Sequence, residues 1–163
     1  MDGAESFPRG QHDPATGLAT EATLTEQLAD ALLARQHSGH QVALLHVDCT
    51  ALGAVDGWAG CRDRDRVRAG LVGRLRRSVR ASDPVGRLAD DEFAVVCTDL
   101  HHAREAELVA ARLQTALAVP LEVGDESMRV PVSVGVDVAG PWSRPEAMVD
   151  DARAISRHRR RTG

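Results

Sequence analysis

Three consecutive acidic residues, Asp90, Asp91 and Glu92, stand between two largely apolar runs of the sequence, residues 85–88 and 93–97. Two apolar runs joined by a few turn residues predict a β-hairpin, so the three carboxylates should lie together at its tip. Carboxylates gathered in one place repel one another and usually need a cation, or a partner that carries one. The spacing therefore indicates a tip that attracts cations.

A fourth acid, Asp48, follows a short buried strand predicted at residues 41–47. If that strand pairs with the hairpin, Asp48 should lie beside Asp91 and Glu92. Hard oxygen ligands of this kind suit Mg²⁺ or Mn²⁺, particularly where the ion bridges to a triphosphate. The alternative interpretation is that Asp48 is a solvated loop residue, because acids are common at turns. Both interpretations stay open at this point.

A second polar pair, Arg80 and Asp83, comes just before the hairpin. The guanidinium fork of an arginine can bond the O6 and N7 atoms of guanine or grip a phosphate, and a carboxylate can accept from guanine N1 and N2. Alternatively, Arg80 closes a helix, where a cation favours the dipole, and Asp83 starts the turn before Pro84. The spacing alone fits both a guanine-nucleotide site and a helix end.

The elements that must position these residues follow from hydrophobic periodicity. Apolar residues at helical spacing predict helices, and short apolar runs bounded by turn residues predict strands. Their order contains a β-α-β-β-α-β core, which favours an α+β, ferredoxin-like sheet with flanking helices. The predicted helices are residues 21–36, 62–80, 103–118 and 145–157, and the predicted strands are residues 41–47, a hairpin at 84–98, 119–123 and 128–138.

The composition limits the class of protein. Hydrophobic residues make up 43% and charged residues 27% of the 163-residue chain, which is typical of one globular domain. We expect a flexible lead-in at residues 1–11 and a single domain at residues 12–163. The net charge of −4 argues against a nucleic-acid partner. Three cysteines without CxxC spacing favour a reduced, cytoplasmic setting, and no apolar run is long enough to predict a membrane span.

Motifs along most of the chain resemble those of the GGDEF family, the diguanylate cyclases that join two GTP molecules into cyclic di-GMP. Residues 12–18 resemble the opening motif of that family, residues 89–93 its signature turn, and residues 133–135 the Ser-x-Gly of its last long strand. The resemblance implies a nucleotide-cyclase palm-like fold, with cyclic di-GMP as a ligand and Mg²⁺ or Mn²⁺ as a cofactor. It also implies site residues: Asp91 and Glu92 in catalysis, Asp48, Asp91 and Glu92 as metal ligands, Asp56 and Asp65 at guanine-reading positions, and Arg80, Asp83 and Arg112 at an inhibitory product site.

The chain departs from this family pattern in the substrate pocket. Ala89 and Asp90 replace the two glycines of the signature turn, so a carboxylate stands where the family places a nucleotide. At about 4 Å and an effective dielectric constant near 20, repulsion between two unit charges costs ~4 kcal/mol. Gly53 stands at the position of a phosphate-contacting lysine, Asp56 replaces a guanine-binding asparagine, and His158 stands at the position of a lysine in the last helix.

Arginine is the only strongly basic residue available to replace those lysines, because the chain contains no lysine. Arg159 and Arg160 are the candidates in the last helix, although a planar fork is not equivalent to an ammonium group. The arginine-rich run at residues 62–80 is interleaved with acids, and we expect it to form an exposed helix face.

The leading hypothesis is a catalytically impaired GGDEF domain that serves as a cyclic di-GMP receptor through Arg80, Asp83 and Arg112. Ligand binding would then promote a homodimer or hold a protein partner. The alternative is a weakly active diguanylate cyclase that converts two GTP molecules to cyclic di-GMP and pyrophosphate at Asp91 and Glu92. A third hypothesis is a protein-interaction scaffold that has lost both ligand sites.

Overall fold

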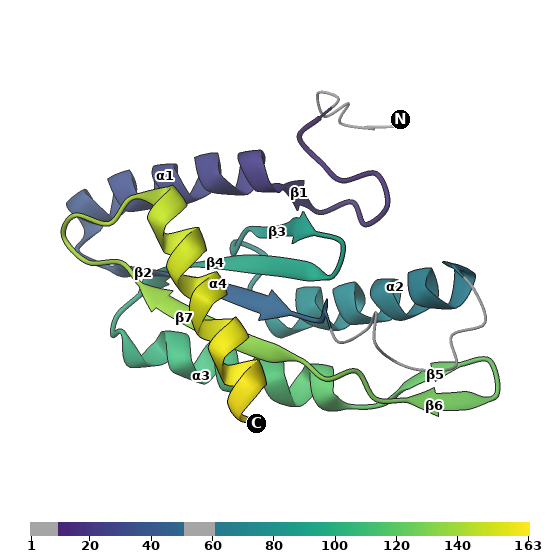
Figure 1. The fold of residues 1–163 in the computed structure, drawn as a ribbon. Coiled ribbons are helices and arrows are strands. Elements are labelled where there is room, and N and C mark those ends of the chain that lie inside the picture. Colours follow the sequence, from purple (N-terminus) through teal and green to yellow (C-terminus); the bar gives the residue numbers. More distant parts are fainter. Residues whose placement is uncertain (1–9, 51–60) are drawn as a thin grey trace.

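The computed structural model describes residues 10–50 and 61–163, and Figure 1 shows how their elements are arranged. The first nine residues of the predicted lead-in lie outside this described part. The described helices are α1 (Glu21–Ser38), α2 (Cys61–Ser78), α3 (Arg104–Ala118) and α4 (Pro145–Thr162). The described strands are β1 (Ala19–Thr20), β2 (Gln41–Asp48), β3 (Val85–Ala89), β4 (Glu92–Leu100), β5 (Leu121–Val123), β6 (Glu126–Met128) and β7 (Ser133–Val138).

The main sheet has the strand order β1-β3-β4-β2-β7. Its core strands β3, β4, β2 and β7 are antiparallel to their neighbours, whereas the short β1 runs parallel to β3. With α2 between β2 and β3 and α3 between β4 and β7, this is the β-α-β-β-α-β arrangement expected from the sequence. The predicted ferredoxin-like fold class is therefore confirmed.

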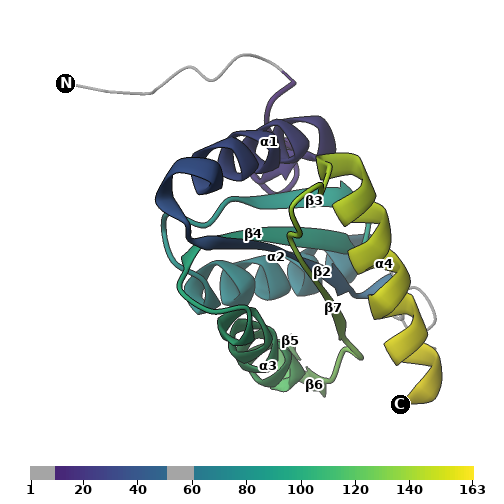
Figure 2. The same ribbon diagram turned by 90° about the vertical axis from the view of Figure 1, so that its left-hand side faces the viewer.

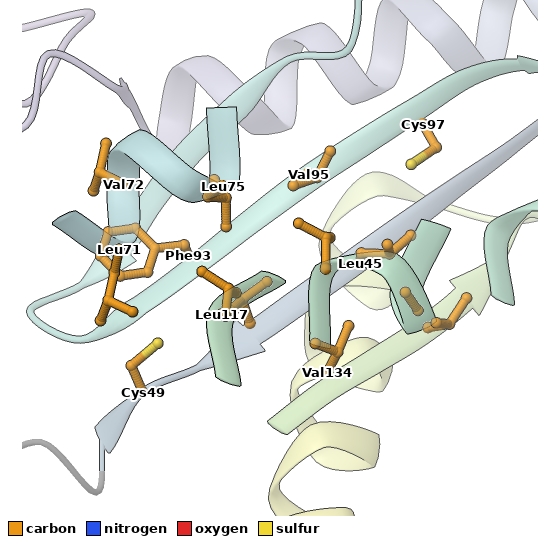
Figure 3. Close-up of a cluster of buried hydrophobic side chains, with 14 of the residues drawn as sticks. Leu45, Cys49, Leu71, Val72, Leu75, Phe93, Val95, Cys97, Leu117 and Val134 are labelled. Atoms are coloured by element: carbon orange, nitrogen blue, oxygen red, sulfur yellow. The ribbon is translucent and has the colours of Figure 1, made fainter. Parts of the chain in front are cut away.

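Hydrophobic side chains are buried on both faces of the sheet, because successive residues of a strand point to opposite sides. Leu45 of β2 and Val95 of β4 pack in a layer with α2 and α3, which Figure 3 shows in close-up. Their neighbours Leu44 and Val96 pack with α1 and α4 on the other face. Figure 2 shows α1 and α4 lying apart from the α2–α3 pair, with the sheet between them.

Local signals define the ends of α1, which continues two residues beyond the predicted end at residue 36. The hydroxyl of Thr20 accepts a hydrogen bond from the backbone N–H of Thr23 and so caps the first turn. Gly39 ends the helix with a φ of 72°, a left-handed conformation that glycine adopts without the penalty of a Cβ atom.

Two predicted boundaries are wrong. The predicted strand at residues 128–138 is interrupted, with β6 ending at Met128 and β7 starting at Ser133. Pro131 lies in the gap, where its missing N–H cannot contribute to a strand ladder. Helix α4 continues five residues beyond the predicted end, to Thr162, because arginines are good helix formers and favour the C-terminal end of the dipole.

Helix α4 crosses β7 at Gly135, where its backbone approaches the strand closely. A Cβ atom at this position would lie 2.5 Å from the backbone N of Ser156 and still closer to the carbonyl oxygen of Ala152. The hydroxyl of Ser133 donates to the carbonyl oxygen of Ser156 at 2.5 Å and ties the same helix to the strand. The Ser-x-Gly motif therefore sets how closely α4 can pack over the sheet.

Candidate functional site

Three of the predicted site acids meet at one end of the sheet. Asp48, the last residue of β2, lies directly opposite Glu92, the first residue of β4. Asp91 is in the turn before β4, and its carbonyl oxygen accepts a 2.9 Å hydrogen bond from the backbone N–H of Cys49. All three acids are buried, with no more than 7% of any residue exposed. The expected juxtaposition of Asp48 with the hairpin tip is therefore confirmed, but the acids are not solvated loop residues.

Glu92 is held by two arginines from α4. Nη2 of Arg157 donates to Oε1 at 2.9 Å, and Nε of Arg153 donates to Oε2 at 3.1 Å. Burial by itself raises the pKa of a carboxyl, but the hydrogen bond from Arg157 and the nearby positive charges outweigh it, so that the pKa of Glu92 is lowered. Glu92 is therefore a buried carboxylate at neutral pH.

His46 lies behind Glu92 and links it to α4. Its Nε2 atom lies 3.4 Å from Oε2 of Glu92, and its Nδ1 atom lies 2.7 Å from the hydroxyl of Ser156. Burial lowers the pKa of the His46 ring, and the carboxylate of Glu92 opposes this effect only in part. The ring is thus neutral at pH 7, and the charge of Glu92 is balanced by the two arginines.

Asp91 is held by two arginines of α2. Nη2 of Arg64 lies 3.4 Å from Oδ2, and Nη2 of Arg68 lies 3.4 Å from Oδ1. Arg68 also donates to the backbone carbonyl of Asp90 and pairs with Asp65 at 2.9 Å. The prediction that this arginine run is simply an exposed helix face is wrong for Arg68, whose side chain is 14% exposed. Asp65, predicted at a guanine-reading position, is exposed.

Asp48 makes its contacts with a threonine and a third arginine of α4. Its Oδ1 atom accepts from the backbone N–H and the hydroxyl of Thr50, and Nη1 of Arg160 lies 3.3 Å from both of its carboxylate oxygens. The contacts to the acids from α4 therefore come from Arg153, Arg157 and Arg160, and the exposed His158 makes no contact with them in the described part of the chain.

The cysteine beside this site is inert. Burial, reinforced by the charges of Asp48 and Asp91, raises the pKa of the Cys49 thiol to about 12. A thiol with so high a pKa is neither a nucleophile nor a metal ligand at neutral pH.

The signature turn is held from outside by Arg87. This side chain donates to the carbonyl oxygens of Ala89 and Asp90, and its Nη1 atom lies 3.1 Å from both carboxylate oxygens of Asp13. Neither Ala89 nor Asp90 has a positive φ, so the turn forms without glycine. The carboxylate of Asp90 is 92% exposed and lies 3.4 Å from Nη2 of Arg87, which weakens the repulsion predicted for it.

Arg80 borders two cavities at the opposite end of α2. One, of about 510 Å³, is also lined by Arg112 and by the apolar side chains of Leu100 and Val109. The other, of about 340 Å³, is also lined by Asp83. Within the described residues, the guanidinium of Arg80 makes no hydrogen bond or ion pair, and so forms no salt bridge to Asp83. Arg80 is exposed.

Asp83 and Arg112 have structural contacts of their own. Oδ1 of Asp83 accepts from the backbone N–H and the hydroxyl of Thr98, and its Oδ2 atom accepts from the backbone N–H of Arg80. Nε of Arg112 donates to the carbonyl oxygen of Ser78 at 2.8 Å, which ties α3 to the end of α2. The structure therefore brings Arg80 and Arg112 to one cavity, while Asp83 is buried in the turn.

Asp48, Asp91 and Glu92 do not fit a divalent cation in this arrangement. Across residues 10–50 and 61–163, no group of three or more histidine, cysteine, aspartate or glutamate side chains is placed to hold a metal ion. Oδ2 of Asp48 is buried without a hydrogen bond, but it faces Arg160. The role of Mg²⁺ stays a prediction, and Asp56 lies outside the described residues.

A comparison with protein families identifies the family of this chain. The family described as "Diguanylate cyclase, GGDEF domain" matches residues 10–163. The chain belongs to the GGDEF family. Within the described part of this GGDEF domain, no helix is sufficiently long and apolar to cross a membrane.

The named relatives of this chain include diguanylate cyclases. Diguanylate cyclase TpbB of Pseudomonas aeruginosa is 27% identical over 146 residues, which cover 88% of this chain and 34% of TpbB. The solved GGDEF domain of TpbB has a TM-score of 0.87 at 25% identity, covering 93% of this chain and 90% of that one. A sensory box/GGDEF family protein from Caulobacter crescentus has a TM-score of 0.84 at 28% identity, covering 94% and 99%. The chain spans about a third of the length of TpbB.

The buried His46–Glu92 pair predicts that this GGDEF domain loses stability in acid. Because the pKa of His46 is lowered on folding, the unfolded chain takes up a proton near the ordinary value of 6.5 before the folded chain does. Glu92 adds a second loss below its ordinary value of 4.5. The free energy of unfolding in urea should therefore be nearly level from pH 8 to 7 and should fall as the pH drops below about 6.5.

The control for this prediction is His46→Gln, which removes the titrating ring and keeps a polar side chain. Its free energy of unfolding should depend less on pH between 7.5 and 5.5 than that of the wild type. Equal slopes for both proteins in this range would contradict the assignment to His46.

Proposed function

We propose that this GGDEF domain is a cyclic di-GMP receptor with impaired cyclase activity, and that Arg80, Asp83 and Arg112 form its ligand site. The observation that carries the proposal is the guanidinium of Arg80, which makes no hydrogen bond or ion pair within residues 10–50 and 61–163 and borders both cavities of the Arg80 region. A buried, already paired arginine would have to break its contacts before it could bind a nucleotide, whereas no described contact occupies the five donors of Arg80.

The surroundings of Arg80 suit a guanine dinucleotide. Arg77 and Arg112 line the same 510 Å³ cavity and supply positive charge for phosphates, while Leu100 and Val109 offer an apolar surface to a base. The Nη atoms of Arg112 remain available, because the described contact of that residue uses Nε. Asp83 holds the turn that presents Arg80 and also lines the smaller cavity.

The impaired cyclase activity is supported by the substrate pocket. Gly53, Asp90 and His158 stand where the family resemblance places a lysine, a glycine and a second lysine. Asp48, Asp91 and Glu92 are each paired with arginine rather than left open to a cation. Phosphoryl transfer depends on positioned cations at the reacting phosphate, so a site whose acids are already neutralised has little to offer.

Replacing Arg80 with alanine tests the proposal. Loss of a charge-assisted hydrogen bond to the ligand should weaken cyclic di-GMP binding roughly 10- to 100-fold in titration calorimetry. Arg66→Ala is the matched control, because Arg66 is an exposed arginine of α2, the helix that precedes Arg80, with only Asp63 as an ion-pair partner among the described residues. Its affinity should match that of the wild type. No binding heat with the wild-type domain would rule out the receptor function.

Residual cyclase activity is the second candidate, because Asp48, Asp91 and Glu92 still lie together at the ends of paired strands. Chromatography of GTP incubated with the domain and Mg²⁺ or Mn²⁺ separates the two functions. A cyclic di-GMP peak that disappears in Glu92→Gln would establish the enzyme, whereas unchanged GTP supports the receptor.

The output of the receptor is proposed to be a ligand-dependent homodimer or a ligand-dependent protein partner, in the cytoplasm. The free, buried thiols of Cys49 and Cys97 support a reduced setting. Light scattering with and without cyclic di-GMP distinguishes the two outputs, because a homodimer doubles the molar mass with no other protein present.

A further inference from the structure

We infer that arginines from α2 and α4 are the permanent counter-cations of Asp48, Asp91 and Glu92 and exclude divalent metal from this end of the sheet. This inference goes beyond the receptor function and does not depend on it, because it concerns the opposite end of α2 from Arg80.

Arginines from two helices surround the three acids. Each acid is contacted by at least one arginine within 3.4 Å, and the arginines come from helices on both faces of the sheet. In the described residues five guanidinium groups thus face three buried carboxylates. The other acids that share Arg68 and Arg153 are Asp65, Glu21 and Asp150, whose side chains are 71%, 46% and 76% exposed and are screened by water, so the buried cluster has no surplus of negative charge to attract a dication. The five are Arg64 and Arg68 of α2 and Arg153, Arg157 and Arg160 of α4.

The contacts of the Glu92 carboxylate differ from those that Mg²⁺ requires. A Mg²⁺ ion needs oxygen atoms at about 2.1 Å in nearly octahedral order. The Glu92 oxygens already accept from Arg157 at 2.9 Å and from Arg153 at 3.1 Å, so a cation could use only their remaining lone pairs, beside two guanidinium groups. Those guanidinium charges would repel an incoming dication at close range.

The three carboxylates are buried. The side chains of Asp48, Asp91 and Glu92 are 0%, 9% and 6% exposed, so little water reaches the carboxylates, although the paired guanidinium groups are partly exposed. A buried carboxylate that loses its partner is left uncompensated, which makes exchange of arginine for metal costly. The same burial leaves little room for the waters that Mg²⁺ normally keeps.

The test is a Mn²⁺ titration followed by electron paramagnetic resonance of the free ion, at constant ionic strength and without nucleotide. The wild type should leave the signal of free Mn²⁺ unchanged. In Arg157→Ala/Arg160→Ala, which removes the arginines from Oε1 of Glu92 and from Asp48 while Arg153 stays on Oε2 of Glu92, Mn²⁺ should bind at least about tenfold more tightly than in the wild type. The matched control Arg157→Lys/Arg160→Lys keeps the charges and should behave as the wild type.

Each outcome decides the inference. Mn²⁺ binding by the wild type that Glu92→Gln abolishes would overturn it, and so would an alanine variant that folds but binds no Mn²⁺. If the alanine variant does not fold, Arg157→Gln/Arg160→Gln makes the same charge change with polar side chains and is held to the same result. Because no cyclic di-GMP is present, failure here is distinct from failure of the receptor function.

Discussion

Gly135→Ala is expected to destabilise the domain by about 3 kcal/mol or more, because the added methyl group overlaps backbone rather than a side chain that can turn away. The nearest atoms are the carbonyl oxygen of Ala152 and the backbone N of Ser156. To accommodate the methyl group, α4 must move off β7 and break the hydrogen bond between Ser133 and the Ser156 carbonyl. Urea unfolding followed by circular dichroism measures the loss.

Gly73→Ala is the matched control. Gly73 lies inside α2, where the nearest atom to an added Cβ is the flexible end of Arg77 at 3.4 Å. Alanine is favoured over glycine in a helix by up to about 1 kcal/mol, so this variant should be as stable as the wild type or more stable. Equal destabilisation by the two substitutions would show that the close approach of α4 does not matter.

Arg153→Ala/Arg157→Ala is expected to cost roughly 2–3 kcal/mol in the free energy of unfolding, because it leaves a buried carboxylate without a cation. The estimate is below the full cost of a broken buried pair, since the Arg157 side chain is 47% exposed and the resulting space admits water. Glu92 would then face only the neutral ring of His46, and its pKa should rise.

A second-site change distinguishes lost charge pairing from lost packing. Adding Glu92→Gln to the double variant removes the uncompensated charge, so it should restore part of the stability. Arg161→Ala serves as the control, because Arg161 is an exposed α4 residue with no hydrogen bond or ion pair in the described part of the chain, and its effect should stay within about 0.5 kcal/mol. A triple variant no more stable than the double variant would contradict the role of Glu92.

The fold and the meeting of the acids could be predicted because they depend on local patterns. Alternation along β2 and β4 sets which residues face each helix layer, and the pairing of these strands places Asp48 opposite Glu92. The break before β7 was missed, although Pro131 carries a usable signal for it.

The arginine contacts could not be predicted, because they depend on how α2 and α4 are rotated and how closely they pack. Sequence spacing alone does not distinguish an exposed Arg68 from one that reaches Asp91. Of the two α4 candidates, Arg159 and Arg160, Arg160 contacts Asp48, and the contact of Arg157 with Glu92 was not predicted. One signal was available: residues 153, 157 and 160 recur at helical spacing and so share a face of α4.

The contact of Arg87 with Asp13 spans 74 positions of the sequence and has a mechanical consequence. The guanidinium of Arg87 donates hydrogen bonds both to Asp13, in the segment before α1, and to the backbone of the signature turn. The turn between β3 and β4 is therefore fixed to the N-terminal segment instead of moving as an isolated hairpin would. A force applied to the chain near Asp13 would act through this contact on Asp91 and Glu92.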